Sequence, residues 1–407
     1  MQTKSGEALA SPRERTDWFS IFALFIAGLA ASMHFAKVAP VMDRIGGDLH
    51  LSLIASGLAV SVLGMVGVLF AISAGAVVAS IGLQRGLMIG LLGGAVIATA
   101  AAAAPTGALF LTLRFFEGFS HLLVVVCAPA LMAQVATRRD RPIALAIWGC
   151  FFGLGFAITS VVAPVIVPVF GWRGLLLSHA GALAGAGALA ATALARSGLC
   201  DSRAPFPGAA ALISAHSAVY RSGAPLLLAL TFCAYTMQFL AVLTFLGRFL
   251  LDVRNMSQSG TGNLIAGASL VTLAATLSAG FLVRSGVPLF TGLMLAFVMT
   301  SAAAAGVFWL VLPPSGMYLS ILVMMAGYGL MPGFVFANVP TVAPTPARAA
   351  LAYGAIAQFG NVGTFTGTPL FAALYQTLGW PGGAVFVAGL AAGGIALAWT
   401  LKERMAT

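Results

Sequence analysis

Charged residues are scarce in this chain of 407 residues, because only 7% are Asp, Glu, Lys or Arg whereas 60% are apolar. Soluble domains ordinarily contain about 25% charged residues, so the deficit excludes a cytosolic enzyme with an ordinary core and an intrinsically disordered chain. The mean hydropathy of +1.03 is typical of a chain embedded in a lipid bilayer. Twelve spans of about 20 residues each would account for most of the apolar residues.

Cysteines and motifs for nucleotide or metal binding are also scarce. The four cysteines contain no Cys-x-x-Cys pair, so we expect small packing residues rather than a disulfide or metal framework; they are Cys127, Cys150, Cys200 and Cys233. The sequence contains no Gly-x-x-x-x-Gly-Lys-Ser/Thr loop and no local pattern of metal ligands. We therefore expect no cofactor, no metal and no enzymatic activity.

Apolar runs bounded by charges, prolines or glycine turns predict twelve transmembrane helices. They cover residues 18–41, 51–80, 86–104, 107–135, 142–169, 173–195, 223–250, 259–283, 287–312, 316–340, 350–377 and 381–401. A polar stretch, 196–222, predicts a linker between two six-helix bundles, 18–195 and 223–401. Short tails, 1–17 and 402–407, complete the chain.

Basic residues lie mostly on one side of these spans. Fourteen fall on the side of the termini, namely Lys4, Arg13, Arg15, Arg85, Arg138, Arg139, Arg141, Arg196, Arg203, Arg221, Arg284, Arg348, Lys402 and Arg404. Only four fall on the other side: Arg44, Arg173, Arg248 and Arg254. Because Lys and Arg accumulate in cytoplasmic loops, both termini are expected in the cytoplasm of a cell with this protein in its inner membrane. The net charge of +10 is thereby explained without a nucleic-acid partner.

The two halves repeat each other at an offset of 208 residues. Gly171-Trp172 follows the fifth span, and Gly379-Trp380 follows the eleventh. A second echo links the turn Gly82 to Gly86, after the second span, with the turn Val283 to Gly286, after the eighth. Parallel six-helix repeats of this kind are typical of one large class of secondary transporters.

Motifs in the N-terminal half carry a resemblance to a known family. The segment Arg114-Phe115-Phe116-Glu117-Gly118 resembles the Arg-x-x-Gln/Glu-Gly motif of the major facilitator superfamily, and Gly75 to Gly86 resembles part of its loop motif. Ala79 and Ser80 stand where that loop motif has an Asp-Arg pair, which argues against the family's usual charge latch at this loop. The resemblance covers essentially the whole chain and implies a twelve-helix transporter that works by alternating access.

The fifth span points to one branch of that family. The segment from Ala144 through Trp148 to Gly171-Trp172-Arg173 is similar to the cyanate and nitroimidazole transporters. The Gly-Pro element of the drug/proton antiporters is absent, since Leu154 follows Gly153. The similarity implies uptake by symport, and export of drugs or metabolites by proton antiport is the alternative.

Ionisable side chains inside spans are costly, about 2.5 to 3.5 kcal/mol on insertion scales, and therefore mark candidate sites. Arg114, Glu117 and His121 are spaced at i, i+3 and i+7, which places them on one stripe of the fourth span. We expect Arg114 to recognise an anionic group, and Glu117 and His121 to exchange protons. The alternative is a permanent Arg114–Glu117 ion pair that only packs helices, with His121 merely hydrogen-bonded.

Further basic residues suggest where a substrate would bind. His34 and Lys37 lie near the outer end of the first span, and Arg248 lies near the outer end of the seventh. Arg248 would face Arg114 and hold a carboxylate from the other half. Each has a structural alternative: His34 in packing, Lys37 at the headgroups, and Arg248 as an interfacial anchor beside Asp252 and Arg254.

Uncharged side chains complete the candidate substrate site. They are Trp148, Tyr235, Gln238, Asn338, Gln358 and Asn361. Trp148 would form an aromatic wall and the others would offer hydrogen bonds, although the same side chains commonly connect neighbouring helices.

Together these patterns predict an all-α membrane protein that moves a small organic, anionic solute with protons. We expect a monomer whose partners are the solute, protons and the bilayer. A membrane-embedded enzyme or a transport-inactive sensor is a rival class, but no nucleophile or metal constellation in the sequence supports it.

Overall fold

The computed structural model describes residues 15–199, 208–221 and 223–406, and these residues form helices without strands. A single 3-10 turn, Ala39–Val41, interrupts the α-helical order. The helices are α1 (Trp18–Ala36), α2 (Met42–Asp48), α3 (Leu53–Ile81), α4 (Leu83–Ala102), α5 (Gly107–Val135), α6 (Arg141–Gly149), α7 (Phe151–Ser197), α8 (Ala209–Arg221), α9 (Gly223–Asp252), α10 (Gln258–Arg284), α11 (Leu289–Phe308), α12 (Pro314–Val342), α13 (Pro346–Leu378) and α14 (Pro381–Ala406).

Four of the long helices begin at a polar residue whose side chain caps the first turn. Ser52, Thr106 and Thr345 each accept a hydrogen bond from a backbone N–H in the first turn of the following helix. Asp17 does the same for α1, through the N–H of Ser20 at 3.1 Å. Such caps satisfy N–H groups that lack an intrahelical partner, and they separate apolar runs that would otherwise merge.

The predicted twelve-span fold is confirmed. Among the described residues, ten helices are long and apolar enough to cross a membrane, and one of them, α7, is 47 residues long. A sharp kink at Gly171 divides α7 into two spans. The more polar α13, 33 residues long, supplies the twelfth span.

The internal repeat appears in the backbone at the predicted positions. Gly171 has φ of +64°, and Gly379, its counterpart 208 residues later, has φ of +67°. The two loop glycines of the second echo, Gly82 and Gly286, have φ of +93° and +95°. Residues with a Cβ rarely adopt these angles, so both halves place glycine where the chain reverses between equivalent helices.

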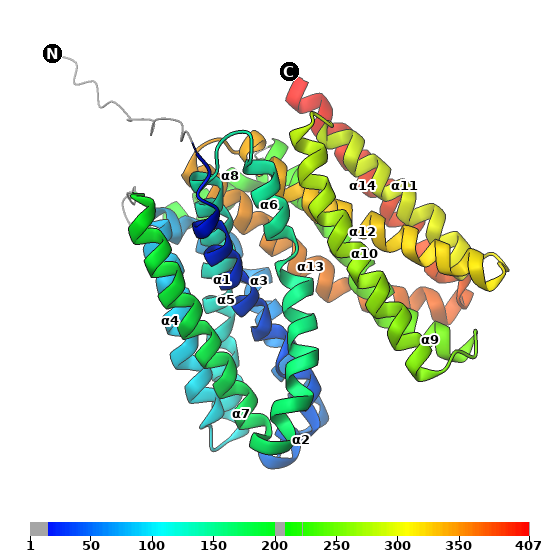
Figure 1. Cartoon of the computed structure of the whole chain (residues 1–407), viewed down its shortest axis with the longest axis horizontal. Coiled ribbons are helices and arrows are strands. Elements are labelled where there is room, and N and C mark those ends of the chain that lie inside the picture. The colour runs from blue at the N-terminus through cyan, green and yellow to red at the C-terminus, as the bar shows by residue number, and fades with distance from the viewer. Residues whose placement is uncertain (1–14, 200–207, 222, 407) are drawn as a thin grey trace.

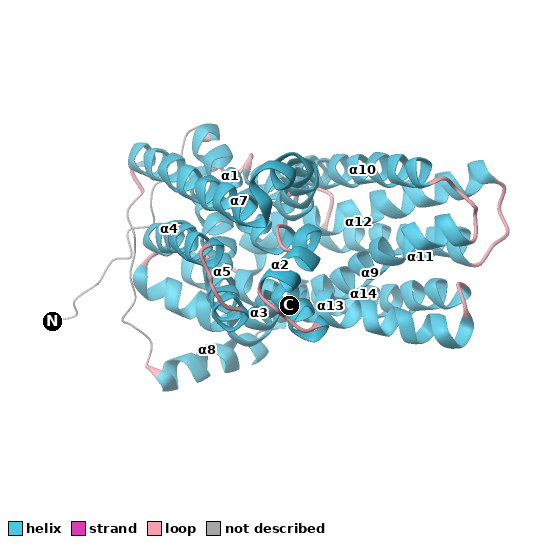
Figure 2. Cartoon of the chain, turned by 90° about the horizontal axis from the view of Figure 1, so that it is seen from below, coloured by secondary structure: helices cyan, strands magenta, loops and turns pink. Residues whose placement is uncertain are grey.

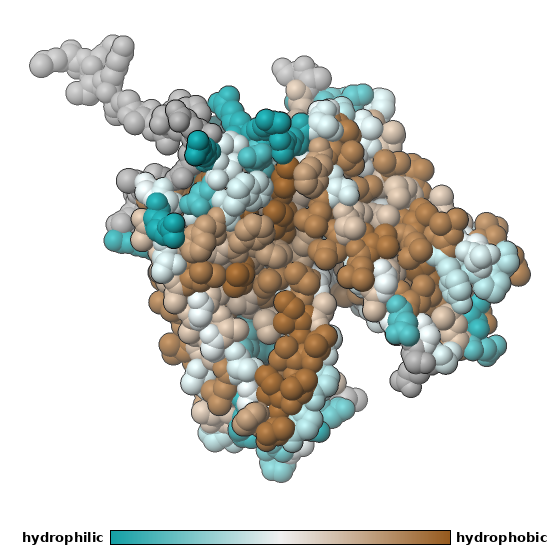
Figure 3. All heavy atoms as spheres, in the orientation of Figure 1, coloured by the Kyte–Doolittle hydropathy of each residue, from teal (hydrophilic) through white to brown (hydrophobic). Residues whose placement is uncertain are grey.

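The helices form two groups that meet on the side of the termini. Helices α1 to α7 make one group and α9 to α14 the other (Figure 1). Helix α13 packs against α3 and α5, and α6 packs against α10 and α12, so these helices connect the two groups; Figure 2 shows α13 beside α3 near the middle of the molecule. On the far side the groups diverge and the surface is hollowed between them (Figure 3). We call this far side the open side.

We call the side of the termini, where the two groups meet, the closed side. Glycines and one ion pair bring the groups together there. A Cβ added to Gly75 in α3 would lie 2.8 Å from the backbone oxygen of Ala350, and one added to Gly354 in α13 would lie 2.6 Å from that of Ala71. Such close backbone approach requires small residues. Nearby, Arg284 at the end of α10 pairs with Asp140 before α6, at 3.4 Å.

The predicted linker contains a helix that the sequence analysis did not anticipate. Residues 200–207 lie outside the described part of the chain, but α8 follows and contacts α3, α9 and α13. His216 shares a hydrogen bond of 2.9 Å with Ser73 of α3, and Tyr220 accepts one of 3.3 Å from Gln358 of α13. One turn of α8 is thus tied to both groups, and partial burial lowers the pKa of His216.

Candidate functional site

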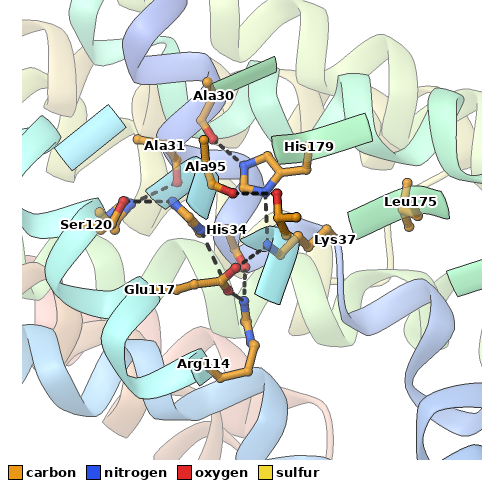
Figure 4. A network of polar contacts seen from close by, with 12 residues as sticks. Ala30, Ala31, His34, Lys37, Ala95, Arg114, Glu117, Ser120, Leu175 and His179 are labelled. Carbon is orange, nitrogen blue, oxygen red and sulfur yellow. Dashed lines mark hydrogen bonds and ion pairs between the residues drawn. The ribbon is translucent and has the colours of Figure 1, made fainter. Parts of the chain in front are cut away.

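Helices α1, α5 and α7 bring five ionisable side chains together inside the N-terminal group. His34, Lys37, Arg114 and Glu117 are fully buried, and His179 is 1% exposed. We call these five residues the charged cluster (Figure 4). Four of them were predicted from sequence as candidate site residues, and the structure places them in contact.

Glu117 is the centre of the charged cluster. Its Oε1 accepts a hydrogen bond from Lys37 Nζ at 2.5 Å, and its Oε2 accepts one from Arg114 Nη1. His34 Nδ1 lies 3.7 Å from Oε2. The predicted stripe on the fourth span therefore does form an Arg114–Glu117 ion pair, and Lys37 joins it from α1 instead of reaching the headgroups.

Backbone carbonyls fix the orientation of Arg114. Its Nε donates to the oxygen of Ala59 in α3, and its Nη1 donates to the oxygen of His34, both at 2.9 Å. Nη2 is buried and has no hydrogen-bond partner. An unpaired donor on a buried guanidinium is expensive, so Arg114 retains capacity for one more acceptor.

His179 supports Lys37 from α7. Its Nε2 donates to the backbone oxygen of Ala30 at 2.9 Å, which leaves Nδ1 as an acceptor for Lys37 Nζ at 2.9 Å. His179 is thereby held neutral. The sequence analysis missed it, although the rule that singled out the other intramembrane ionisable residues applies to it equally.

The hydrogen-bond assignments leave the charged cluster with an excess of positive charge. Arg114 and Lys37 contribute two positive charges, Glu117 contributes one negative charge, and the histidines are neutral, so the net charge is one positive. Uncompensated charge in a low-dielectric interior is unfavourable. The charged cluster would therefore be stabilised by an anion.

His34, Glu117 and His179 also lie close enough to share a cation, with ligand atoms within 4.8 Å of one another. The ammonium of Lys37 bonds to two of these three residues. The ammonium of Lys37 therefore occupies the position that a bound metal ion would take among these three residues.

A buried apolar core adjoins the charged cluster within the N-terminal group. Val38 follows Lys37, Phe110 lies one turn before Arg114, and Leu175 lies one turn before His179. Each is at most 1% exposed and belongs to one compact core with Val41 and Trp172.

His121 lies beside the charged cluster but not in it. Its Nδ1 donates to the backbone oxygen of Ala31 at 2.9 Å, and its ring packs edge-on against Phe35 at 4.9 Å. The side chain keeps 6% exposure, so it is less enclosed than His34.

Two other predicted residues are not near the charged cluster. Arg248 is exposed and pairs with Asp252 in its own helix at 3.0 Å, so this conformation does not place it opposite Arg114. Trp148 is fully buried, stacks on Phe151 at 4.4 Å and contacts α1 at Gly28.

In the C-terminal group, Tyr235 and Gln238 lie on α9 beside aromatic rings. Tyr235 stacks on Phe239 and lies 6.4 Å from the ring of Tyr328 in α12. Gln238 is fully buried with neither amide atom hydrogen-bonded, and the buried Tyr328 hydroxyl also lacks a partner. Sequence reasoning missed Tyr328, because a tyrosine in an apolar span carries no charge to mark it.

The remaining amide candidates bond within the protein. Asn338 and Asn361 each donate to a backbone oxygen one turn earlier in the same helix. Asn361 also fills the space opposite Gly67 of α3. Gln358 donates to Tyr220, and its Oε1 has no partner.

This arrangement, twelve spans in two repeated groups with a buried charged cluster inside the first, is that of a membrane transporter fold. Residues 21–360 match the profile of the Major Facilitator Superfamily, and the chain belongs to that family. No curated protein matches it in sequence.

Solved structures share the fold. The human organic anion transporter MFSD10 (TETRAN) superposes with a TM-score of 0.75 at 17% identity, covering 94% of this chain and 99% of that one. The E. coli fucose:proton symporter FucP gives 0.72 at 14% identity, covering 94% and 97%. The proton:xylose symporter XylE, bound to 6-bromo-6-deoxy-D-glucose, gives 0.70 at 14% identity, covering 94% and 95%.

Proposed function

We propose that this chain moves a small organic anion across the inner membrane by alternating access, in symport with protons. Both termini would lie in the cytoplasm, as the distribution of Lys and Arg predicts. The hollow between the two helix groups would then face the outside of the cell in this conformation (Figure 3), which suits uptake.

The observation that carries this proposal is the buried excess of positive charge around Glu117. Lys37 and Arg114 both bond to this single carboxylate, and the buried Nη2 of Arg114 has no partner. A carboxylate is the natural complement to a guanidinium, because the two planar groups match in geometry and charge. An anionic solute would balance the charge and satisfy the open donor.

The C-terminal group would hold the uncharged part of the solute. Tyr235, Phe239 and Tyr328 provide aromatic surfaces. The unpartnered amide of Gln238 and the unpartnered hydroxyl of Tyr328 provide hydrogen bonds. Solute sites commonly combine apolar walls with a few polar groups of this kind.

The structural neighbours are consistent with this proposal. One of them is described as an organic anion transporter and two as proton symporters. At 14% to 17% identity these likenesses show only the fold, so the choice of an anion depends on the charged cluster.

The test uses purified protein and thermal shifts with benzoate, lactate, succinate and tetraphenylphosphonium, followed by uptake into proteoliposomes under imposed pH gradients. We expect a carboxylate to stabilise the protein, and the stabilisation to be lost in Arg114→Gln. Accumulation driven by the pH gradient should be lost in Glu117→Gln. Arg248→Gln is the matched control, since Arg248 is an exposed arginine whose ion pair is with Asp252 in its own helix, and it should behave like the wild type.

A different outcome would overturn the proposal. If only tetraphenylphosphonium binds, and Arg114→Gln leaves that binding unchanged, the charged cluster is structural and export of cations by proton antiport explains the data better.

A further inference from the structure

We infer that His34 Nδ1 is the atom that receives the coupled proton, rather than Glu117 or His121. This inference rests on the proposed symport and names its proton carrier. It follows from the hydrogen bonds that surround the imidazole of His34, which leave one ring nitrogen open and direct it at a carboxylate.

The hydroxyl of Ser120 fixes the tautomer of His34. Ser120 Oγ donates its proton to the backbone oxygen of Gly90 at 2.7 Å, so it can only accept from His34 Nε2 at 3.2 Å. Nε2 therefore carries the hydrogen of the neutral ring. Nδ1 is left as a bare lone pair, buried and without a hydrogen-bond partner.

The bare Nδ1 faces an acceptor. It lies 3.7 Å from Glu117 Oε2. When the His34 ring is neutral, a lone pair on Nδ1 therefore points toward a lone pair on that oxygen. A proton bound at Nδ1 becomes a donor toward that oxygen, and an approach of less than about 1 Å would complete a charge-assisted hydrogen bond. Protonation of His34 thus creates a bond and breaks none.

The other titratable groups around His34 are already engaged. On α5, both oxygens of Glu117 accept from cations, and a proton on either oxygen would displace Lys37 or Arg114. On α7, His179 uses both ring nitrogens and packs edge-on against His34 at 4.6 Å. The neighbouring helix α4 contributes only backbone, at Gly90 and Gly94.

His121 is the remaining candidate, and its surroundings differ. It also has one ring nitrogen committed to a carbonyl, that of Ala31. Its ring faces Phe35, however, and no carboxylate among the described residues is within ion-pair distance of it. A proton on His121 would gain no partner in the charged cluster.

This assignment explains why an anion and a proton would travel together. A proton on His34 raises the charge of the cluster by one, and a carboxylate at Arg114 lowers it by one. When both bind, the net charge stays the same, and the cost of burying it during the conformational change is unaltered.

Gly94 of α4 makes room for the hydrogen bond between Ser120 and His34. A Cβ on Gly94 of α4 would collide with Ser120 Oγ and approach His34 Nε2 to 3.2 Å. Helix α4 therefore needs glycine at this position for the Ser120–His34 hydrogen bond to form. Ser120 is accordingly a positioning residue, and Ser120→Ala should shift the pH profile of uptake without abolishing it.

The first experiment needs no solute. Ring-nitrogen NMR of histidine-labelled protein in nanodiscs, titrated from about pH 8 to about pH 3, should show a residue protonated at Nε2 throughout that gains a second proton at Nδ1 as the pH falls. The signal is assigned by its absence in His34→Gln. A His34 that stays neutral throughout, or is protonated at Nδ1 when neutral, would overturn the inference.

The second experiment separates coupling from transport. Radiolabelled benzoate is followed in proteoliposomes, both as accumulation under a pH gradient and as exchange at equal pH. In His34→Gln we expect accumulation under the pH gradient to fall by about tenfold or more relative to exchange at equal pH. His121→Gln, the matched control, should retain both.

The outcomes distinguish the inference from the function it rests on. If wild type exchanges benzoate but does not respond to the pH gradient, the symport fails and the inference fails with it. If wild type is coupled, while His121→Gln loses accumulation and His34→Gln keeps it, only the inference fails and His121 is the proton carrier.

Discussion

The two helix groups repeat one fold but bury different chemistry. The N-terminal group buries Arg, Lys, Glu and three His side chains, whereas the C-terminal group, over its described residues, buries Thr, Asn, Gln and Tyr but no Asp, Glu, Lys, Arg or His. Its charges lie near helix ends, as with the exposed Arg248–Asp252 pair. The two halves therefore share one backbone fold, but only the N-terminal half buries ionisable side chains among the described residues.

This difference shows how a two-fold repeated fold can divide a task. Charged groups respond to protons and to the charge of a solute, whereas aromatic and amide groups respond to its shape and its hydrogen bonds. Removing a charge from the N-terminal cluster should therefore lower stability, whereas removing an unpartnered polar atom from the C-terminal group should not.

The largest effect is expected from breaking the charged cluster. Glu117→Gln would leave Lys37 and Arg114 buried without a counter-charge, and we expect a loss of about 3 kcal/mol or more in the free energy of unfolding. Lys37→Met combined with Glu117→Gln restores the original net charge and should recover much of this loss. Thermal unfolding in detergent measures both. A single variant as stable as wild type would show that the ion pairs contribute nothing.

The next largest effect should come from Gly94→Ala. The added methyl group must displace Ser120 or His34, and overpacking of this kind costs about 1–3 kcal/mol. Gly93→Ala on the same helix is the control, because a Cβ there meets nothing within 4 Å. Equal melting temperatures for the two variants would contradict the close packing of α4 on α5.

The opposite sign is expected in the C-terminal group. Gln238→Leu and Tyr328→Phe remove buried polar atoms that have no partner, so each should leave stability unchanged or raise it by about 1 kcal/mol. The KM for the solute should rise at the same time. Thr276→Val is the control, because Thr276 donates to the backbone oxygen of Gly329 at 2.8 Å, and it should lower stability. Destabilisation by Gln238→Leu would mean that its amide is needed for folding.

A smaller effect concerns the contact between the halves. Asp140 pairs with Arg284 across the closed side, and such partly exposed pairs contribute about 0.2–1 kcal/mol. Asp140→Asn should therefore shift the conformational equilibrium by about 1.4-fold to fivefold away from this conformation. Spin labels at the exposed Ser160 of α7 and Ser269 of α10 would report a shorter distance on the open side. Asp252→Asn, which breaks a pair within one helix, should not change it.

The smallest effect concerns α8, which touches both halves. Burial lowers the pKa of His216, so the packed helix favours the neutral ring, and its docking is weakened as the pH falls and the ring becomes charged. The protection factors of the α8 amides, which take account of the slower intrinsic exchange at low pH, should fall in wild type as the pH falls. His216→Gln should show less pH dependence, and an unchanged dependence would assign the effect to another group.

Much of the fold could be predicted because the bilayer imposes one-dimensional rules. Span length, apolar composition and the loop glycines Gly171 and Gly379 are all visible in the chain. Prediction was weaker outside the spans, because no apolar run marked α8 in the linker. The candidate site was also predicted only in part. Arg114, Glu117, His34 and Lys37 could be identified because ionisable residues are rare in spans. His179 was overlooked, and the uncharged Tyr328 could not be distinguished from other aromatic residues of the spans.

The sequence by itself determined that this chain lies in a membrane, crosses it twelve times and concentrates its intramembrane charges in the first half, because hydropathy and burial cost are properties of single residues. Only the tertiary structure decided which of those charges share Glu117, that Arg248 stands apart from Arg114, and that Ser120 leaves one nitrogen of His34 open. Those outcomes depend on hydrogen-bond directions and distances between helices far apart in the chain, and no local pattern of residues contains them.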